Sequence, residues 1–499
     1  MTSVPGTPSS RAAANTPEIL AANAVGAGRL PFPMLGTYGA GGLAEHVVAF
    51  GLNNLLLFYL TVICGLGGAV AGFAVGAAVV VDAVIQPLVG SLSDNSHSRH
   101  GRRHPFMLAG ALPLAIGFGL LYSMPSGLAG APLFACATVI LLVIRIAHAV
   151  FNVPYMALGA ELSSDYHERS LIVAARLLCG SLGAALATYL AYGVFMKGHA
   201  GQLQREAYAP FAWSCAAIVI AGTGISIIGT LRARHRLRVT IPHQGTSIRR
   251  FAKEIGELLR SPSFRALFFM ALCFQVAYSA SAALGLHANT YFWKLTTEQI
   301  LSVNLLGVAG FLAGCVLAAF LRRVIQKRTT SMVGMGMVCL CQVGLVPLRL
   351  AGFIPPEAIV AAVTVSVMLT QVGVAMTLVG YQSMMADAAD QHEHLFGARR
   401  QGLYYAGTAL AAFAASGIGS MLAGTTLDII GFPHGKAAAT LAIPLETTRT
   451  LALAYGPSMG VLTVAAIIIL FGYRIGQEEH AAIRDALERR AAPGTSFQA

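Results

Sequence analysis

Twelve apolar runs, each long enough to cross a lipid bilayer, constrain this chain more than any other feature. A membrane-spanning helix needs about 20 mostly apolar residues. Six runs precede a basic stretch and six follow it, which predicts an all-α membrane protein made of two six-helix bundles. The runs cover residues 36–62, 68–92, 105–123, 131–157, 170–195, 208–231, 264–285, 299–322, 330–350, 355–386, 401–425 and 450–474.

Composition agrees with a membrane protein and argues against a soluble one. Hydrophobic residues make up 56% of the 499 residues and charged residues 11%, against roughly 25% charged in an ordinary soluble domain. The formal net charge is +12, which would suggest nucleic-acid binding in a soluble protein. Here the basic residues gather in the termini and in alternate loops. We therefore expect a lipid bilayer as partner, and no nucleic acid.

The distribution of basic residues also predicts the orientation. Arg99, Arg102 and Arg103 follow the second run, whereas the loop 124–130 carries no charge. Because cytoplasmic loops are enriched in Lys and Arg, both termini should be cytoplasmic, and the membrane should be a bacterial inner (plasma) membrane. The expected units are a disordered cytoplasmic tail (1–35), an N-terminal bundle (36–231), a basic cytoplasmic linker (232–262), a C-terminal bundle (263–474) and a second cytoplasmic tail (475–499).

The chain carries no recognisable catalytic or metal-binding motif. It has no GxSxG elbow, no phosphate-binding loop and no His and acid cluster with zinc spacing. Seven of its eight cysteines lie in the apolar runs and Cys64 lies two residues after the first run, so they resemble small buried hydrophobic residues. We predict that the protein is not an enzyme and has no metal or cofactor.

Ionisable residues inside the apolar runs are candidates for function, because each costs at least about 2.5 kcal/mol at membrane depth. They gather in the first half. Asp82 and Gln86 are four apart and should share one helix face, and a second stripe steps by three and four residues. This group contains two carboxylates and two guanidiniums. Either these charges pair to hold helices together, or one arginine binds an anionic substrate. The residues concerned are Glu45, His46, Asp82, Gln86, Arg145, His148, Asn152 and Arg176.

Three stretches resemble the glycoside-pentoside-hexuronide:cation symporters, the branch of the major facilitator superfamily that includes melibiose permease. They are "DAVIQPLVGSLSDNSHSRHGRRHPF" (82–106), "FNVPYMALGAELSSDYHERSLIVAAR" (151–176) and "ADAADQHEHLFGARRQGLYYAG" (386–407). The resemblance implies the major facilitator fold, in which two six-helix bundles are related by pseudo-symmetry. It also implies alternating access and a central substrate site.

The chain keeps only part of the family's binding residues. The resemblance places a carboxylate of helix two at Asp82 and the arginine of helix five at Arg176. At the other family positions this chain has different residues, namely His46 after Glu45 on helix one, Gln86, Asn152, Met156 in place of a stacking aromatic ring, and Phe413 near the helix-eleven lysine. The expected substrate-binding set is Glu45, His46, Arg145, His148, Asn152, Met156 and Arg176.

The missing carboxylates bear on the coupling ion. Sodium needs several oxygen ligands, usually with carboxylate charge, and only Asp82, Gln86 and Asn152 could supply them here. A proton needs only one or two titratable groups, which Asp82, Glu45 and His46 can provide. We expect coupling to protons through Asp82, Gln86 and Glu45, with sodium as the alternative.

Charged residues in the matching loops suggest a cytoplasmic gate. Interhelical ion pairs there could hold one conformation shut, although exposed loop charges contribute little. The expected gate residues are Asp94, Arg102, Arg103, Asp165, Arg169, Asp387, Asp390, Arg399 and Arg400.

Together these features predict a monomeric secondary transporter that moves a glycoside or a related polar, possibly anionic, small-molecule solute. Two alternatives stay open: a carrier of a lysolipid-like anion, because Met156 and Phe413 are apolar, and a transport-inactive membrane receptor or assembly factor. In the second half we expect Trp293 to be an anchor at the membrane interface, and we expect the neutral polar residues to form interhelical hydrogen bonds.

Overall fold

The computed structural model describes residues 31–96, 98, 101–163, 165–198, 200–232, 256–321, 323–396, 401–439 and 443–491. Within these ranges twelve helices are long and apolar enough to cross a membrane, and no strand is present. The predicted all-α architecture with twelve spans is confirmed.

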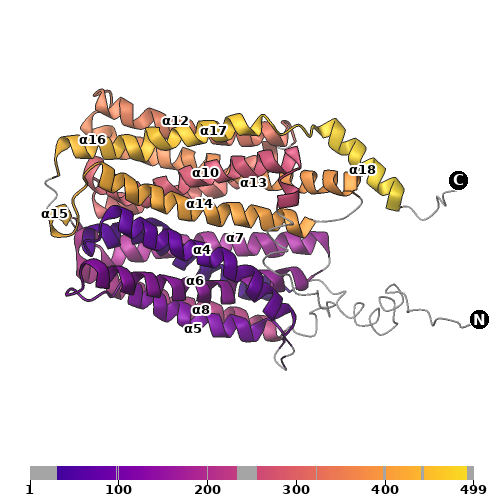
Figure 1. The fold of residues 1–499 in the computed structure, drawn as a ribbon, viewed down its shortest axis with the longest axis horizontal. Coiled ribbons are helices and arrows are strands. Elements are labelled where there is room, and N and C mark those ends of the chain that lie inside the picture. Colours follow the sequence, from indigo (N-terminus) through magenta and orange to yellow (C-terminus); the bar gives the residue numbers. More distant parts are fainter. Residues whose placement is uncertain are drawn as a thin grey trace, which may run out of the picture.

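The chain forms two halves of six spans each, which lie side by side (Figure 1). The first half contains α2 (Phe32–Phe50), α4 (Gly68–Asp94), α5 (His104–Leu121), α6 (Gly130–Glu161), α7 (Tyr166–Thr188) and α8 (Tyr208–Arg232). The second half contains α10 (Pro262–His287), α11 (Thr297–Leu321), α12 (Lys327–Leu350), α13 (Ile359–Phe396), α14 (Gln401–Ile429) and the consecutive helices α16 (Leu445–Leu453) and α17 (Met459–Leu470).

Two short helices mark the two ends of the molecule. The connection α15 (Lys436–Ala439) lies at one end, and α18 (Gln477–Ala491) lies at the other. We call these the α15 end and the α18 end. The expected tail 475–499 thus contains a helix, which packs against α13.

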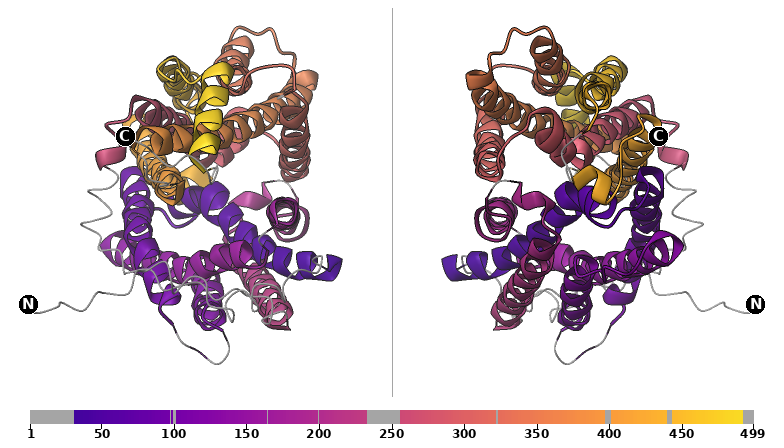
Figure 2. Two further views of the ribbon diagram at one scale, coloured as in Figure 1. Left: turned by 90° about the vertical axis from the view of Figure 1, so that its right-hand side faces the viewer. Right: turned by 90° about the vertical axis from the view of Figure 1, so that its left-hand side faces the viewer.

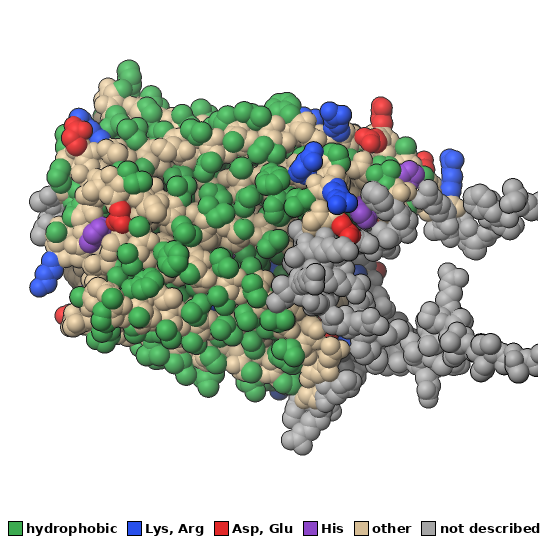
Figure 3. Space-filling view, viewed as in Figure 1, with side chains coloured by type: hydrophobic (Ala, Val, Ile, Leu, Met, Phe, Trp, Pro, Cys, Tyr) green, Lys and Arg blue, Asp and Glu red, His purple; other side chains and the backbone are tan. Residues whose placement is uncertain are grey.

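The lateral surface between the two ends is apolar (Figure 3). Large aliphatic side chains point outward there, including Leu112, which is 55% exposed, and Val461, which is 67% exposed. The charged side chains visible in that view gather at the ends. This arrangement suits a protein surrounded by lipid tails, which solvate hydrocarbon but not charge.

Several spans contain π-helical turns toward the α15 end. The first span continues from α2 through η2 (Gly51–Leu55), α3 (Leu56–Phe58) and η3 (Tyr59–Ile63). Further π-helical turns are η4 (Tyr189–Phe195) after α7, η8 (Ala288–Phe292) after α10 and η10 (Ala454–Ser458) between α16 and α17. A π-helical turn holds one more residue than an α-helical turn, and such turns are frequent at functional sites.

The two halves are stacked when seen from either end (Figure 2), and their closest packing joins α4 to α14. Glycines make this approach possible. A Cβ atom added at Gly72 would lie 2.7 Å from the carbonyl oxygen of Ser420, and one added at Gly424 would overlap the carbonyl oxygen of Gly68. Backbone therefore lies directly against backbone where the halves meet.

Candidate functional site

Asp82 lies at the centre of a buried polar group in the first half. Its side chain has no solvent exposure, and one carboxylate oxygen lies 3.6 Å from Nη1 of Arg145 on α6. The Nε2 amide of Gln86, one turn along α4, donates to the other oxygen at 3.0 Å. Asp82 and Gln86 therefore share one face of α4, as expected, and Arg145 of α6 lies against that face.

Glu45, His46 and Arg176 lie where α2 packs against α7. The Nδ1 atom of His46 is 3.0 Å from the carbonyl oxygen of Gly42, and the Arg176 side chain lies against Gly42. Oxygen Oε2 of Glu45 is buried and has no hydrogen-bond partner. Among the described residues, neither Glu45 nor Arg176 forms an ion pair, so of the two arginines in the predicted substrate-binding set only Arg145 pairs with a carboxylate.

The remaining predicted residues on α6 include polar atoms that make no hydrogen bond. Nδ1 of His148 and Oδ1 of Asn152 are buried without hydrogen-bond partners. Met156 is 43% exposed. Together with Arg145 they follow the stripe that the spacing predicts, but no hydrogen bond joins His148, Asn152 or Met156 to Asp82 in the described part of the chain.

The predicted charges after α4 form a cluster within the first half. Both arginines bind Glu161 at the end of α6: Arg102 at 2.7 Å and Arg103 at 2.8 Å. Arg103 also pairs with Asp94 and donates to Ser93 Oγ at 2.6 Å. These bonds tie α4, α5 and α6 together at the α18 end. Glu161 is the acceptor that the predicted set lacks, although it lies in the same matching stretch.

Asp165 and Arg169 stabilise the start of α7. Asp165 is the N-cap and accepts from the backbone N–H of Glu168 at 2.9 Å. Ser163 donates to the Glu168 carboxylate at 2.6 Å, and Arg169 donates to the carbonyl oxygen of Ser163 at 2.9 Å. These interactions are all local to one helix end.

The corresponding charges of the second half attach α18 to the bundle. Asp387 on α13 pairs with Lys327 of α12 at 2.7 Å and lies 3.4 Å from Nε2 of His480 on α18. The same histidine nitrogen is 3.2 Å from the Asp390 carboxylate. The predicted gate residues Arg399 and Arg400 lie outside the described residues.

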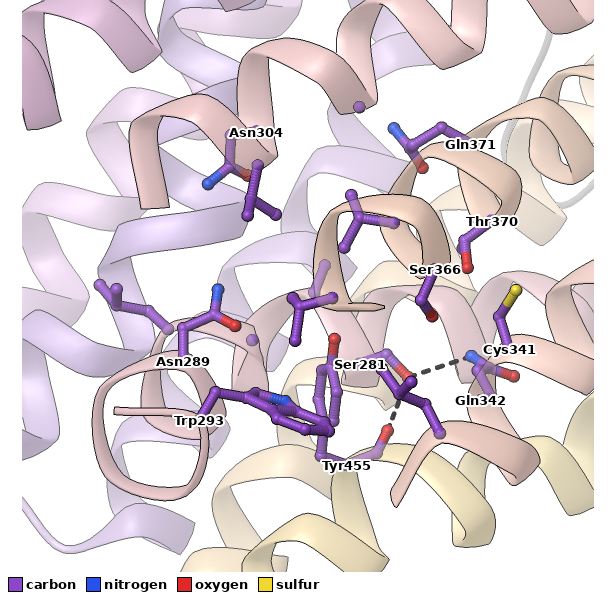
Figure 4. Close-up of a pocket in the computed structure, with 18 of the residues that line it drawn as sticks. Ser281, Asn289, Trp293, Asn304, Cys341, Gln342, Ser366, Thr370, Gln371 and Tyr455 are labelled. Atoms are coloured by element: carbon purple, nitrogen blue, oxygen red, sulfur yellow. Dashed lines mark hydrogen bonds between the residues drawn. The ribbon is translucent and has the colours of Figure 1, made fainter. Parts of the chain in front are cut away.

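A cavity of about 170 Å³ lies in the second half and reaches the first (Figure 4). Asn289 and Asn304 border one side of the view, Ser366, Thr370 and Gln371 the other. Two aromatic rings, Trp293 and Tyr455, border it as well, and Asn54 and Tyr192 extend it into the first half. None of these residues is in the predicted substrate-binding set.

The position of Trp293 differs from the one expected from the sequence. It is not an anchor at the membrane interface, because only 4% of it is exposed and it lines the cavity. The π-helical turns explain part of this result. Asn54, Tyr192, Asn289 and Tyr455 each belong to one of them, and the wider turn alters which residues face inward. A spacing of 3.6 residues per turn does not predict that change.

Within the described residues, all hydrogen bonds between the two halves lie at the α15 end. Thr61 Oγ1 is 3.0 Å from Nε2 of the buried His287. Asp428 of α14 accepts from the backbone N–H groups of Gly68 and Ala69 at 2.7 and 2.8 Å, so it caps the N-terminus of α4. Thr297 donates to Gly198 O at 3.0 Å. These contacts join the halves at that end.

Comparisons with known proteins agree with this architecture. The family described as MFS/sugar transport protein matches residues 37–477. The chain is 24% identical to an uncharacterized symporter of Synechocystis sp., over 93% of this chain and 97% of that protein. It is 26% identical to the putative glycoside/cation symporter YagG of Escherichia coli, over 92% and 95%. It is 23% identical to the isoprimeverose transporter of Lactiplantibacillus pentosus, over 88% of each.

A solved structure has the same fold. The crystal structure of a D-xylose-proton symporter aligns with a TM-score of 0.62 at 14% sequence identity, over 90% of this chain and 99% of that one. The family match spans nearly all the helices that form the polar group and the cavity. The chain therefore belongs to the MFS/sugar transport proteins, in the glycoside-pentoside-hexuronide:cation symporter branch of the major facilitator superfamily, and it is a membrane transporter and not an enzyme.

Proposed function

We propose that this protein is a proton-coupled secondary transporter that carries a glycoside across a bacterial inner membrane by alternating access. The observation that supports it best is the buried pair of Asp82 and Arg145. An intramembrane ion pair is costly and is a candidate for the coupling site. The relatives include a putative glycoside/cation symporter and an isoprimeverose transporter, which favours a glycoside.

The pair suggests how proton and solute binding are linked. With Asp82 ionised, its charge balances that of Arg145. Protonation of Asp82 removes that balance and leaves the guanidinium without an anionic partner, which is unfavourable at this depth. Acceptor groups of the solute can then compensate Arg145, so that proton binding and solute binding favour each other.

The same geometry favours a proton over sodium. Gln86 already donates to one oxygen of Asp82, and the second oxygen faces Arg145. A sodium ion would have to displace a guanidinium and collect further oxygens, whereas a proton needs one carboxylate oxygen.

We further propose that the α18 end is cytoplasmic and that the protein acts as a monomer. Arg102, Arg103 and Lys327 lie at the α18 end, and the positive-inside rule places such loops in the cytoplasm. The seal at the α15 end then faces outward, and alternating access requires it to open.

Uptake of radiolabelled neutral methyl glycosides into proteoliposomes tests this function. We expect an inward proton gradient to increase uptake and a sodium gradient to have no effect. Asp82→Asn should abolish the stimulation, and so should Asp82→Asn combined with Arg145→Gln, which leaves no unpaired charge. Glu446→Gln is the matched control, because that carboxylate is 87% exposed at the α15 end. Sodium-driven uptake would overturn proton coupling, and no uptake of any glycoside would favour the receptor or lysolipid alternatives.

A further inference from the structure

The cavity in the second half contains hydroxyl and amide groups that have no partner in the protein. Among the described residues, the side chains of Asn289, Ser366 and Thr370 make no hydrogen bond. The Gln371 carbonyl accepts from the Tyr278 hydroxyl at 3.2 Å, which leaves the Gln371 amide donors free. These side chains are half-buried, so their unused hydrogen-bonding groups are available to a polar molecule bound in the cavity.

Other polar groups of the same wall are fixed by one another. Gln342 donates to Ser281 Oγ at 3.2 Å and accepts from Thr463 at 3.0 Å. Ser281 in turn donates to the carbonyl oxygen of Tyr455 at 3.1 Å. This series of hydrogen bonds connects α10, α12 and the last span. It therefore holds the Tyr455 backbone in place beside the side chains that have no partner. A site with preorganised walls and a few free hydrogen-bonding groups is typical of small-molecule recognition.

The aromatic rings and the size of the cavity suit a sugar ring. The indole of Trp293 and the phenol of Tyr455 both line it. An aromatic ring offers a flat apolar face with a polar edge, which matches a pyranose that has C–H groups on its faces and hydroxyls around its rim. A volume of about 170 Å³ is many times what a single water molecule needs, so the cavity has room for a small solute.

The lining also indicates the charge of the solute. No Asp, Glu, Lys, Arg or His is among the described residues that line the cavity. A carboxylate buried there would lose its hydration without a cation to replace it. Of the two arginines predicted to bind an anion in the first half, Arg145 already pairs with Asp82, and neither Arg145 nor Arg176 lines this cavity.

We propose that this cavity binds the ring of an uncharged, polyhydroxylated solute, with Trp293 as the stacking platform and Asn289, Ser366, Thr370 and Gln371 as hydroxyl partners. The inference rests on the proposed transport function and refines it. Solute recognition lies mainly in the second half, and the charged groups of the first half serve coupling.

The two tryptophans of the chain allow a direct binding test. Trp213 is 44% exposed on the lateral surface of the first half, so Trp213→Phe leaves Trp293 as the single tryptophan. Purified Trp213→Phe protein is titrated with methyl β-xyloside, methyl β-glucoside and methyl α-galactoside, and with methyl β-glucuronide, while its emission is recorded. We expect at least one neutral glycoside to change the emission of Trp293, and the glucuronide to bind at least about tenfold more weakly than the glucoside.

Two variants on α13 locate the site. Thr370→Val removes an unused hydroxyl from the cavity wall. Thr364→Val removes a hydroxyl that bonds to Val360 O at 2.7 Å within the same helix and does not line the cavity. We expect Thr370→Val to weaken glycoside binding about tenfold, the factor expected for one lost hydrogen bond, and Thr364→Val to leave it unchanged.

The outcomes separate this inference from the transport function. Wild-type uptake of a neutral glycoside with equal binding by Thr370→Val and Thr364→Val would overturn the cavity assignment alone. Tighter binding of the glucuronide than of the glucoside would overturn the neutral-solute assignment. Failure of wild-type protein both to bind and to take up any of the glycosides would overturn the proposed function itself.

Discussion

Asp82 and Arg145 depend on each other because solvent does not reach the carboxylate. Removal of one partner leaves the other as an uncompensated buried charge, whereas removal of both leaves two neutral groups of similar size. Gln86 adds a hydrogen bond but no charge. The energy of this group therefore lies in the pair and not in either residue.

We predict that Arg145→Gln lowers the free energy of unfolding by about 3 kcal/mol, the usual cost of breaking a buried pair. Adding Asp82→Asn to that variant should restore most of the loss. Apparent melting temperatures of the single and double variants in one detergent measure this coupling. A double variant as unstable as the sum of the two single variants would contradict it.

At the scale of the helix, α7 begins with a side-chain N-cap. Asp165 accepts from the backbone N–H of Glu168, and the Glu168 carboxylate accepts from Ser163. The first of these bonds satisfies one of the free N–H groups of a helix start, and the second fixes the Glu168 side chain beside it. The position of Asp165 thus follows from the needs of α7, and its role does not require a moving partner.

We expect Asp165→Ala to destabilise the protein by about 1 kcal/mol, the usual effect of losing an N-cap, and to leave the rate of glycoside uptake unchanged. Asp165→Asn should retain the stability, because asparagine caps equally well. Thermal unfolding and uptake are measured on both. Loss of uptake in the asparagine variant would show instead that the charge acts in a gate.

At the scale of the whole molecule, the span count and the fold follow from the sequence, because apolar runs and bilayer thickness determine them. The face shared by Asp82 and Gln86 follows from helix periodicity. The cavity does not, since it depends on which helices meet and on π-helical turns that shift Asn289 and Tyr455 inward. The role of Glu161 as the common partner of two arginines does not follow from the sequence either, because ion pairs form across helices, where one sequence gives no distances.

The contact between α4 and α14 makes a further prediction. Gly424→Ala should reduce uptake at least about tenfold, because its Cβ would overlap Gly68 and keep the halves apart. Gly344→Ala on α12 is the matched control, since a Cβ there meets nothing within 4 Å, and alanine favours a helix over glycine by about 1 kcal/mol. Uptake at several concentrations measures both. Equal uptake by the two variants would show that close α4–α14 packing is dispensable.

The glycine surface between α4 and α14 also has a kinetic consequence. Interdigitated side chains resist sliding, because each must leave one hole before it enters the next. Where backbone lies on backbone there is less interdigitation to undo, so α4 and α14 can rotate against each other with little steric resistance. The hydrogen bonds between the halves at the α15 end, among them those of Asp428 to the start of α4 and of Thr61 to His287, then contribute to the barrier to this rotation. Changes in these hydrogen bonds can therefore alter the turnover rate without altering the glycine contact.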